Sequence, residues 1–297
     1  MIIRHRGSQL VIQAPAKINL FLDVLACRSD GFHDLETVIC AIDLYDTLVL
    51  EAIEGDQVTL EMTVPGNGGQ QLREPLPEGE QNIIVKALHQ LARSAGVAAG
   101  MAVGLTKRIP SSAGLGGASS DAAAALLGAA QLWKLDWSRE RLFEVAAEVG
   151  SDVPFFLNGS AAICRGRGEI VEGVNNRSRL HLVLVHPPQG LSTANVFAAC
   201  RPGRSAASGP LLEAMEAGNR GRLVELLHNS LQATAAELEP WIGKLEELLA
   251  DSGCLGYQMS GSGTSFFAIC GHRRHARQLA ARLRGMQPGR VDCATTL

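Results

Sequence analysis

The chain has 297 residues, of which 46% are hydrophobic, and a formal net charge of −3. This length and composition predict a globular protein with one large or two medium domains and a substantial core. The slightly acidic balance argues against a dedicated nucleic-acid surface, which is usually strongly basic, so we expect a small-molecule ligand and no nucleic-acid partner.

The cysteines and the N-terminus bear on the compartment. Seven cysteines are scattered without a Cys-x-x-Cys pair, which indicates neither a disulfide framework nor a zinc cluster and favours a reducing environment. The first residues lack the apolar segment of a signal peptide, and the longest apolar run, residues 122–130, is about half of what a membrane span needs. We therefore expect a cytoplasmic protein without a membrane partner.

Residues 11–25 alternate in the pattern of a half-buried strand. Ile18 and Leu20 fall on one face, and Lys17 and Asn19 fall side by side on the other. A lysine in such a place is most often a solvated edge residue, and the alternative is a functional lysine next to an amide.

A turn-rich connection follows at residues 28–35. Phe32 could stack on a flat heterocycle, and His33 could donate to it and accept from it. A hairpin loop with a packed phenylalanine is the simpler alternative. Beyond it, the patterns predict strands at residues 36–42, 47–52 and 57–64 and a surface loop at residues 65–79.

A helix at residues 82–95 and a strand at residues 101–106 lead into a glycine-rich segment, residues 110–120. It holds a proline and three glycines, and Ser119 or Ser120 is the expected N-cap of the alanine-rich helix behind it. Glycine amides and a helix N-terminus together favour phosphate. The segment matches neither the P-loop nor the Rossmann pattern, so a purely structural turn stays open.

The second half of the chain mixes helices and strands, as in an α+β protein. Asp152 follows a helix at residues 138–149 and is either the N-cap of a short helix or a functional carboxylate at the edge of an apolar segment. Beyond it we expect a hairpin at residues 161–171, a strand at 180–185, a polar loop at 190–197 and a mobile linker at 201–209. Three helices at residues 210–217, 220–236 and 240–249 follow. The chain then forms two strands around a glycine-serine turn at residues 253–270 and a final helix at 273–284.

Five segments together resemble the superfamily of galactokinase, homoserine kinase, mevalonate kinase and phosphomevalonate kinase, the GHMP kinases. In chain order they are residues 14–20, 31–33, 110–120, 150–156 and 260–263. The first, second and fourth resemble the branch that phosphorylates the 2-hydroxyl of a cytidine diphosphate-linked methylerythritol in the non-mevalonate isoprenoid route. The resemblance covers nearly the whole chain.

The resemblance implies a two-lobed α+β GHMP-kinase fold with the active site between the lobes. The N-terminal lobe, residues 1–160, would be ribosomal protein S5 domain 2-like, and the C-terminal lobe, residues 161–297, ferredoxin-like. ATP and Mg²⁺ are the implied cofactors. The sequence shows no carboxylate pair for the metal.

The resemblance also implies roles for single residues. Lys17 and Asp152 would form the catalytic pair. The substrate would be bound by Asn19, Phe32, His33, Thr193, Phe197 and Ser262. The nucleotide would be bound by Asn82 and by Pro110, Ser111, Ser112, Ala113, Gly114, Leu115, Gly116, Gly117, Ala118, Ser119 and Ser120.

The chain departs from the family in its Gly-Phe-His loop, because tyrosine is commoner at the position of Phe32. Stacking survives this change, whereas a phenolic hydrogen bond does not. Two other functions stay open. A homoserine or mevalonate type of kinase would have no use for Phe32 and His33, and an inactive nucleotide-binding regulator would have no use for Lys17 and Asp152.

Overall fold

The computed structural model describes residues 1–65 and 79–297, and the chain divides into two compact units. Unit 1 comprises Met1–Ala16, Leu44–Ile109 and Gly116–Gly159, and unit 2 comprises Lys17–Asp43, Pro110–Leu115 and Ser160–Leu297. Two long strands, β2 (Gln9–Cys27) and β3 (His33–Ile53), contribute residues to both units. Of the surface loop expected at residues 65–79, residues 66–78 lie outside the described part of the chain.

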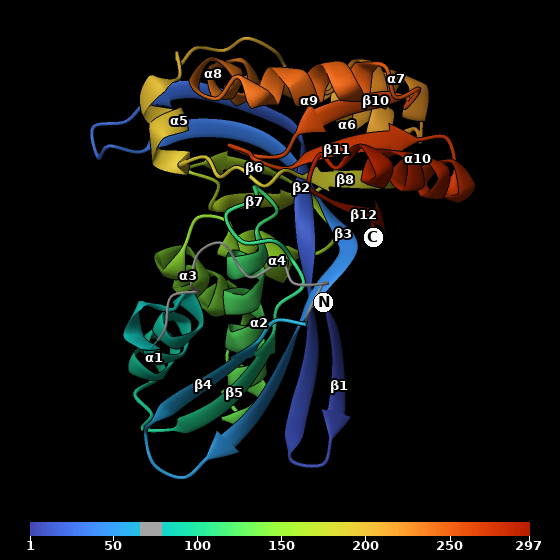
Figure 1. The fold of residues 1–297 in the computed structure, drawn as a ribbon. Helices are drawn as coiled ribbons and strands as arrows, with labels where there is room; N and C mark the ends of the chain where they lie inside the picture. The colour runs from blue at the N-terminus through green and yellow to red at the C-terminus, as the bar shows by residue number, and fades with distance from the viewer. Residues whose placement is uncertain (66–78) are drawn as a thin grey trace. The chain divides into compact units, whose positions relative to one another are not determined.

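Unit 1 combines a mixed sheet with helices. β1 pairs antiparallel with β2, and β5 pairs antiparallel with β3 and parallel with β4. Helices α1 and α2 lie next to each other in this unit (Figure 1). The elements that lie wholly in unit 1 are β1 (Ile2–Arg6), β4 (Val58–Thr63), a 3₁₀ turn (Gly79–Gln81), α1 (Ile83–Ala95), β5 (Gly100–Thr106), α2 (Gly117–Leu132), α3 (Arg139–Val149) and α4 (Val153–Asn158).

Helix α2 is alanine-rich because it lies directly on the sheet. The four alanines at residues 122–125 are fully buried. A Cβ added at Gly128 would come within 3.0 Å of side-chain atoms of Ile12 and Leu50, which belong to β2 and β3. Small side chains are therefore required for this close approach of helix and sheet. The helix expected after the glycine-rich segment is confirmed.

Unit 2 contains a second, four-stranded antiparallel sheet in the order β10-β11-β8-β12. Helix α10 packs against β8, β11 and β12 (Figure 1). The elements that lie wholly in unit 2 are β6 (Ala161–Gly166), β7 (Ile170–Gly173), β8 (His181–His186), α5 (Thr193–Ala199), α6 (Gly209–Glu216), α7 (Arg220–Glu225), β9 (His228–Asn229), α8 (Leu231–Leu238), α9 (Trp241–Ala250), β10 (Gly256–Met259), β11 (Phe266–Cys270), α10 (Arg273–Met286) and β12 (Arg290–Thr295).

Several elements differ from the sequence predictions. The strands expected at residues 36–42 and 47–52 are one continuous strand, β3. The interval between the two expected strands holds two aspartates with hydrogen-bond partners: Asp43 accepts from the amide of Thr295, and Asp46 accepts from the amide of Ile109. Polar groups satisfied in this way can stay inside a strand. Strands β1 and β12 were not predicted.

The helix expected at residues 220–236 is interrupted, and the polar loop expected at residues 190–197 is partly helical. In the first case, the short strand β9 pairs with β2 and separates α7 from α8. In the second, Ser192 caps α5 by accepting from the amide of Asn195. A tertiary strand pairing and an N-cap thus override the local pattern.

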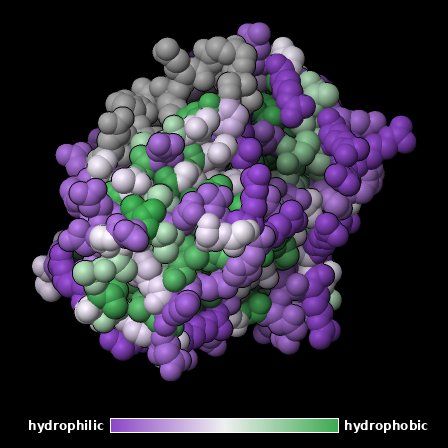
Figure 2. Space-filling view, turned by 90° about the horizontal axis from the view of Figure 1, so that it is seen from below, coloured by the Kyte–Doolittle hydropathy of each residue, from purple (hydrophilic) through white to green (hydrophobic). Residues whose placement is uncertain are grey.

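The described ranges contain no helix long and apolar enough to cross a membrane. All seven cysteines are present as thiols. The face shown in Figure 2 carries hydrophobic residues in small groups among hydrophilic ones. Exposed large hydrophobic side chains of unit 1 include Ile2, Ile3 and Ile53. Scattered exposure of this kind is normal for folded proteins.

The segment at residues 201–209, expected to be a mobile linker, is anchored in unit 2 by two carboxylates. Asp23 is fully buried and accepts hydrogen bonds from the amides of Ser205 and Ala206 and from the Ser205 hydroxyl. Glu36 accepts from the hydroxyl of Ser208 at 2.7 Å and forms an ion pair with Arg204. The linker prediction therefore missed a segment held by side chains more than 160 residues earlier in the chain.

Asp23→Asn is expected to lower the free energy of unfolding by about 2 kcal/mol at pH 7, because hydrogen bonds to a charged acceptor are lost. Burial opposes the charge of Asp23, but the hydrogen bonds from Ser205, Ala206 and His228 prevail and hold its pKa below the ordinary value. This stability is present above the unfolded pKa of about 3.9 and is lost as the pH falls through the native pKa.

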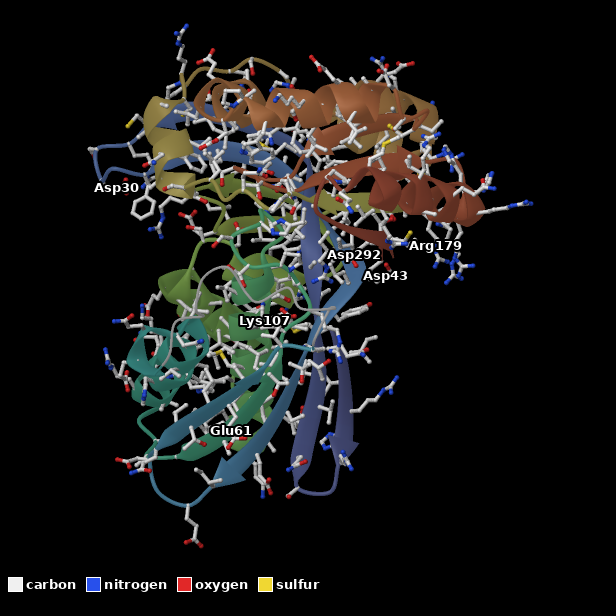
Figure 3. All side chains as sticks on the ribbon, in the orientation of Figure 1. Asp30, Asp43, Glu61, Lys107, Arg179 and Asp292 are labelled. Carbon is white, nitrogen blue, oxygen red and sulfur yellow. The ribbon has the colours of Figure 1, made fainter. Side chains whose placement is uncertain are left out.

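Denaturant unfolding of both proteins between pH 3 and pH 8 checks this prediction of a pH-dependent difference. The difference should shrink toward acid pH. A matched control is Asp30→Asn, because Asp30 is exposed in the connection between β2 and β3 (Figure 3), where solvent weakens its hydrogen bonds from Arg28 and the amide of Phe32, so its loss should cost much less. A stability difference for Asp23→Asn that is the same at both ends of the pH range would contradict the assignment.

Candidate active site

Lys17 and Asn19 lie next to each other on β2 in unit 2, and both are buried. Lys17 Nζ donates to Asn19 Oδ1 at 2.7 Å, and Asn19 Nδ2 donates to Thr37 Oγ1 at 2.8 Å. The alternation that placed Lys17 and Asn19 on one surface is confirmed. The alternative of a solvated edge lysine is wrong, because Lys17 is only 4% exposed.

The Ser-Gly-Ser-Gly turn holds the first half of the glycine-rich segment within unit 2. Ser260 Oγ donates to the carbonyl oxygen of Gly114 at 2.8 Å, and the amide of Ser265 donates to that of Ala113 at 3.2 Å. The amide of Lys17 donates to the carbonyl oxygen of Leu115 at 2.9 Å. Three successive carbonyls of the segment are therefore bonded to Ser265 just after the turn, to the turn itself and to β2.

These contacts determine where the amides of the segment point. In a trans peptide the N–H points opposite to the C=O, so the amides that follow these three carbonyls face away from the turn and from β2. Gly114 and Gly116 have left-handed backbones, with φ of 71° and 67°. Successive amides combined with left-handed residues form a concave site for anions. The phosphate cradle at this segment stays a prediction.

Helix α2 begins at Gly117 with Gly116 as its N-cap, so the prediction that Ser119 or Ser120 caps it is wrong. The two serines lie in the first helical turn instead. The left-handed glycine carries the chain into the helix without a side-chain cap. The hydroxyl of Ser120 is buried and has no hydrogen-bond partner among the described residues.

Four of the predicted substrate-binding residues form two pairs in unit 2. The rings of His33 and Phe197 lie 5.3 Å apart and are tilted by 38°. Thr193 and Ser262 hydrogen-bond to each other through their hydroxyls at 2.9 Å. Because Thr193 and Phe197 are four residues apart on α5, they share one face of that helix.

Phe32 is 49% exposed, and the guanidinium of Arg167 lies 4.8 Å from the centre of its ring. Arg167 comes from the connection between β6 and β7 and was missed by the sequence analysis, which assigned that stretch to a hairpin turn. Its neighbouring glycines pointed to a turn and carried no signal for a ring contact. Cation–π contacts of this kind are common in folded proteins, so a substrate contact of Phe32 stays a prediction.

Asn82 and Asp152 both lie in unit 1, at the N-termini of two helices. Asn82 caps α1 by accepting from the amide of Ile84 at 2.9 Å. Asp152 occupies the N-cap position of α4, but its side chain makes no capping hydrogen bond. The expectation that Asp152 serves only as a cap is therefore not supported by its geometry. A contact of Asn82 with adenosine stays a prediction.

Two observations bear on how a nucleoside triphosphate and its metal ion could bind. Two buried hydroxyls, those of Ser111 and Ser120, have no hydrogen-bond partner among the described residues, and both belong to the glycine-rich segment. Residues 1–65 and 79–297 contain no group of three or more His, Cys, Asp or Glu side chains suited to a metal. Magnesium commonly keeps several waters and binds through substrate phosphates, which such a site allows.

Comparison with known proteins places this geometry in a family. The family model described as "GHMP kinases N terminal domain" matches residues 82–160, and the one described as "GHMP kinases C terminal" matches residues 211–288. The chain is 39% identical to a 4-diphosphocytidyl-2-C-methyl-D-erythritol kinase of Pelotomaculum thermopropionicum, over 91% of this chain and 92% of the relative.

Solved structures agree with the sequence relatives. A crystal structure of a 4-(cytidine 5'-diphospho)-2C-methyl-D-erythritol kinase matches with a TM-score of 0.78 and 33% identity, covering 96% of this chain and 98% of the other. A homoserine kinase from Cytophaga hutchinsonii matches with a TM-score of 0.75 at 19% identity, over 100% of this chain and 97% of the other, and thus shares the fold. The expected α+β GHMP-kinase fold is confirmed. The chain belongs to the GHMP kinases and, within them, to the family of 4-diphosphocytidyl-2-C-methyl-D-erythritol kinases.

Proposed function

We propose that the protein transfers the γ-phosphoryl group of ATP to the 2-hydroxyl of 4-diphosphocytidyl-2-C-methyl-D-erythritol, giving the 2-phosphate and ADP, in non-mevalonate isoprenoid biosynthesis. Family membership supports a small-molecule kinase, and the relatives' names supply the substrate. Magnesium accompanies ATP in the proposed reaction. The seven free thiols favour a reaction in the reducing cytoplasm.

The observation that carries the proposal is the double role of the Ser-Gly-Ser-Gly turn in unit 2. Ser260 bonds to the glycine-rich segment, and Ser262, two residues later, bonds to Thr193 of α5. The same helix carries Phe197 to the ring of His33. One rigid turn therefore links the proposed phosphate-binding backbone to an aromatic and imidazole pair suited to a pyrimidine.

In the proposed mechanism, the protein mainly positions the reactants and neutralises charge, as phosphoryl transfer requires. The substrate oxygen forms a bond to the γ-phosphorus while the bond from that phosphorus to the bridging oxygen of ADP breaks. Asp152 accepts the hydroxyl proton, and Lys17 neutralises charge on the transferred group. We expect the proton to move to Asp152 late along a loose transition state.

The other proposed contacts belong to binding. Asn19 orients the substrate next to Lys17, to which it is hydrogen-bonded. His33 reads the edge of the cytosine through its donor and acceptor nitrogens, and Phe32 and Phe197 contact its faces. Residues 110–120 receive the triphosphate, and Asn82 contacts the adenosine.

Incubation of the protein with ATP, Mg²⁺ and 4-diphosphocytidyl-2-C-methyl-D-erythritol tests the proposal. We expect one ADP to be released for each product molecule. In the NMR spectrum of that product, the new phosphorus signal should couple to carbon 2 of the methylerythritol. Methylerythritol phosphate without the cytidine, homoserine and mevalonate serve as competing acceptors. Faster turnover of any of these three would replace the proposed substrate, and ADP release with none of the four would favour a nucleotide-binding regulator.

Phe197→Ala is expected to raise the KM for the cytidine substrate about 5- to 150-fold, because stacking of a base on an aromatic ring is worth about 1–3 kcal/mol. The KM for ATP should stay within about twofold, which provides an internal control. Phe197→Tyr keeps the ring and should resemble the wild type. Steady-state kinetics with each substrate varied in turn measures both constants, and an equal rise of the two would remove Phe197 from the pyrimidine site.

A further inference from the structure

Three charged side chains are buried together in unit 1, and the proposed mechanism uses none of them. Asp46 is on β3, Lys107 directly follows β5, and Asp121 is on α2. Their exposed fractions are 0%, 5% and 2%. Lys107 Nζ forms an ion pair with each carboxylate, to Asp121 at 2.8 Å and to Asp46. In Figure 3, Lys107 is labelled in the interior of this unit.

The network joins the two points where the chain enters and leaves the glycine-rich segment. Lys107 stands three residues before Pro110, and Asp121 follows Ser120 directly. The ion pair between Lys107 and Asp121 therefore closes a loop that contains the whole proposed phosphate-binding backbone. Loop closure of this kind removes conformational freedom from the enclosed residues.

Asp46 adds further bonds at the entry point. Its Oδ1 accepts hydrogen bonds from the amides of Arg108 and Ile109, while Oδ2 meets Lys107 Nζ. Three consecutive residues are thus bonded to one carboxylate. At the exit point, a Cβ on Gly117 would lie 3.0 Å from Lys107 Nζ, so this first residue of α2 packs closely on the network.

Burial and pairing act on the charges of this network in opposite directions. Burial raises the pKa of Asp121 to about 8, with Lys107 opposing the effect and the neighbouring Asp46 adding to it. Burial also opposes the charge of Lys107, but the two carboxylates prevail and raise its pKa. The charge states of the three side chains therefore depend on their contacts with one another.

A buried ion pair is a weak source of stability, because desolvation cancels most of the attraction, and apolar replacements of similar volume often do as well. What an ion pair provides and an apolar contact does not is a defined geometry between its partners. The placement of this network at both ends of one functional segment therefore indicates a role in geometry.

We propose that Asp46, Lys107 and Asp121 are positioning residues for ATP binding, which hold the two ends of the glycine-rich segment at the separation that its amides need to receive the triphosphate. The inference rests on the proposed nucleotide-binding role of residues 110–120. It concerns only the two ends of the segment that belong to unit 1, residues 107–109 and 116–121.

Asp121→Ala is the first test, because it opens the loop and leaves Lys107 paired with Asp46. We expect the Kd for a non-hydrolysable ATP analogue, measured by calorimetry on the purified chain, to rise about tenfold or more, which corresponds to about 1.4 kcal/mol. The KM for ATP should rise in parallel, and the KM for the cytidine substrate should stay within about twofold.

Asp121→Asn is the rescue variant, since its amide oxygen can accept from Lys107 Nζ as the oxygen of Asp121 does. It should recover most of the affinity lost in Asp121→Ala. Glu61→Gln is the matched control, because Glu61 is an exposed carboxylate on β4 of the same unit (Figure 3). Its affinity for the analogue should equal that of the wild type.

The outcomes separate a positioning role from a structural one. Circular dichroism first establishes that each variant is folded at the assay temperature. Unchanged analogue affinity in folded Asp121→Ala, equal changes in the two KM values, or failure of Asp121→Ala to fold would each overturn the proposal. Because the analogue assay needs no second substrate, a wild-type protein that binds the analogue but does not phosphorylate the cytidine substrate would sink the proposed function alone.

Discussion

Gly114→Ala is expected to lower kcat/KM for ATP about 100-fold or more, the scale of loss that a displacement of about 1 Å can cause in an active site. Gly114 has a φ of 71°, a backbone conformation that residues other than glycine rarely adopt. An added Cβ would overlap the carbonyl oxygen of Ser260 and lie 3.0 Å from that of Gly263. Both obstacles are backbone atoms, so the glycine-rich segment must move off the Ser-Gly-Ser-Gly turn.

Gly7→Ala separates the two costs of the Gly114 substitution. Gly7 has φ of 63°, but a Cβ there would have no atom within 4 Å. Both variants carry the strain of a left-handed alanine, about 1–2 kcal/mol, and only Gly114→Ala carries the collision. Steady-state kinetics with ATP varied, on proteins shown to be folded, gives the comparison. Equal activities of the two variants would mean that the segment does not need its contact with Ser260.

Asp152→Asn is expected to lower kcat about 100- to 10,000-fold, the usual contribution of a general base, while the affinity for ATP stays unchanged. The amide has nearly the same shape as the carboxylate and cannot take the hydroxyl proton. The side chain of Asp152 makes no capping hydrogen bond to α4, so the substitution removes no cap, and thermal melting measures its effect on stability separately from turnover. A loss of turnover without a loss of stability is the signature of a chemical role.

Ser138→Ala is the matched control for Asp152, because Ser138 caps α3 by accepting from the amide of Arg141. Removal of such a cap typically costs about 1 kcal/mol of stability. The control should therefore lower the melting temperature and leave kcat unchanged, whereas Asp152→Asn should lower kcat. A kcat for Asp152→Asn within about tenfold of the wild type would leave Asp152 an orienting group at most.

Local patterns were sufficient for many elements of the fold. The helical spacing at residues 82–95 and 138–149 corresponds closely to α1 and α3. The alternation that placed Lys17 beside Asn19 was also correct. These features depend on residues within one or two turns of each other, so a single stretch of sequence contains the whole signal.

Other features failed because the deciding partner is far away in the chain. Residues 201–209 look like a polar linker, but they are anchored through Asp23 and Glu36. Residues 220–236 have helical spacing, but β9 interrupts them to pair with β2. The local sequence does not reveal such partners, because these contacts join residues that come together only in the folded unit 2.

The sequence by itself determined the α+β character, most of the helices and the motifs by which the chain resembles the GHMP kinases. Only the tertiary structure showed that Lys17 is buried, that the Ser-Gly-Ser-Gly turn bonds to both the glycine-rich segment and α5, and that Lys107 joins the two ends of that segment. The physical reason is that periodicity and capping are short-range properties of one segment. Burial, ion pairing and the direction of backbone amides depend on which distant segments the fold brings into contact.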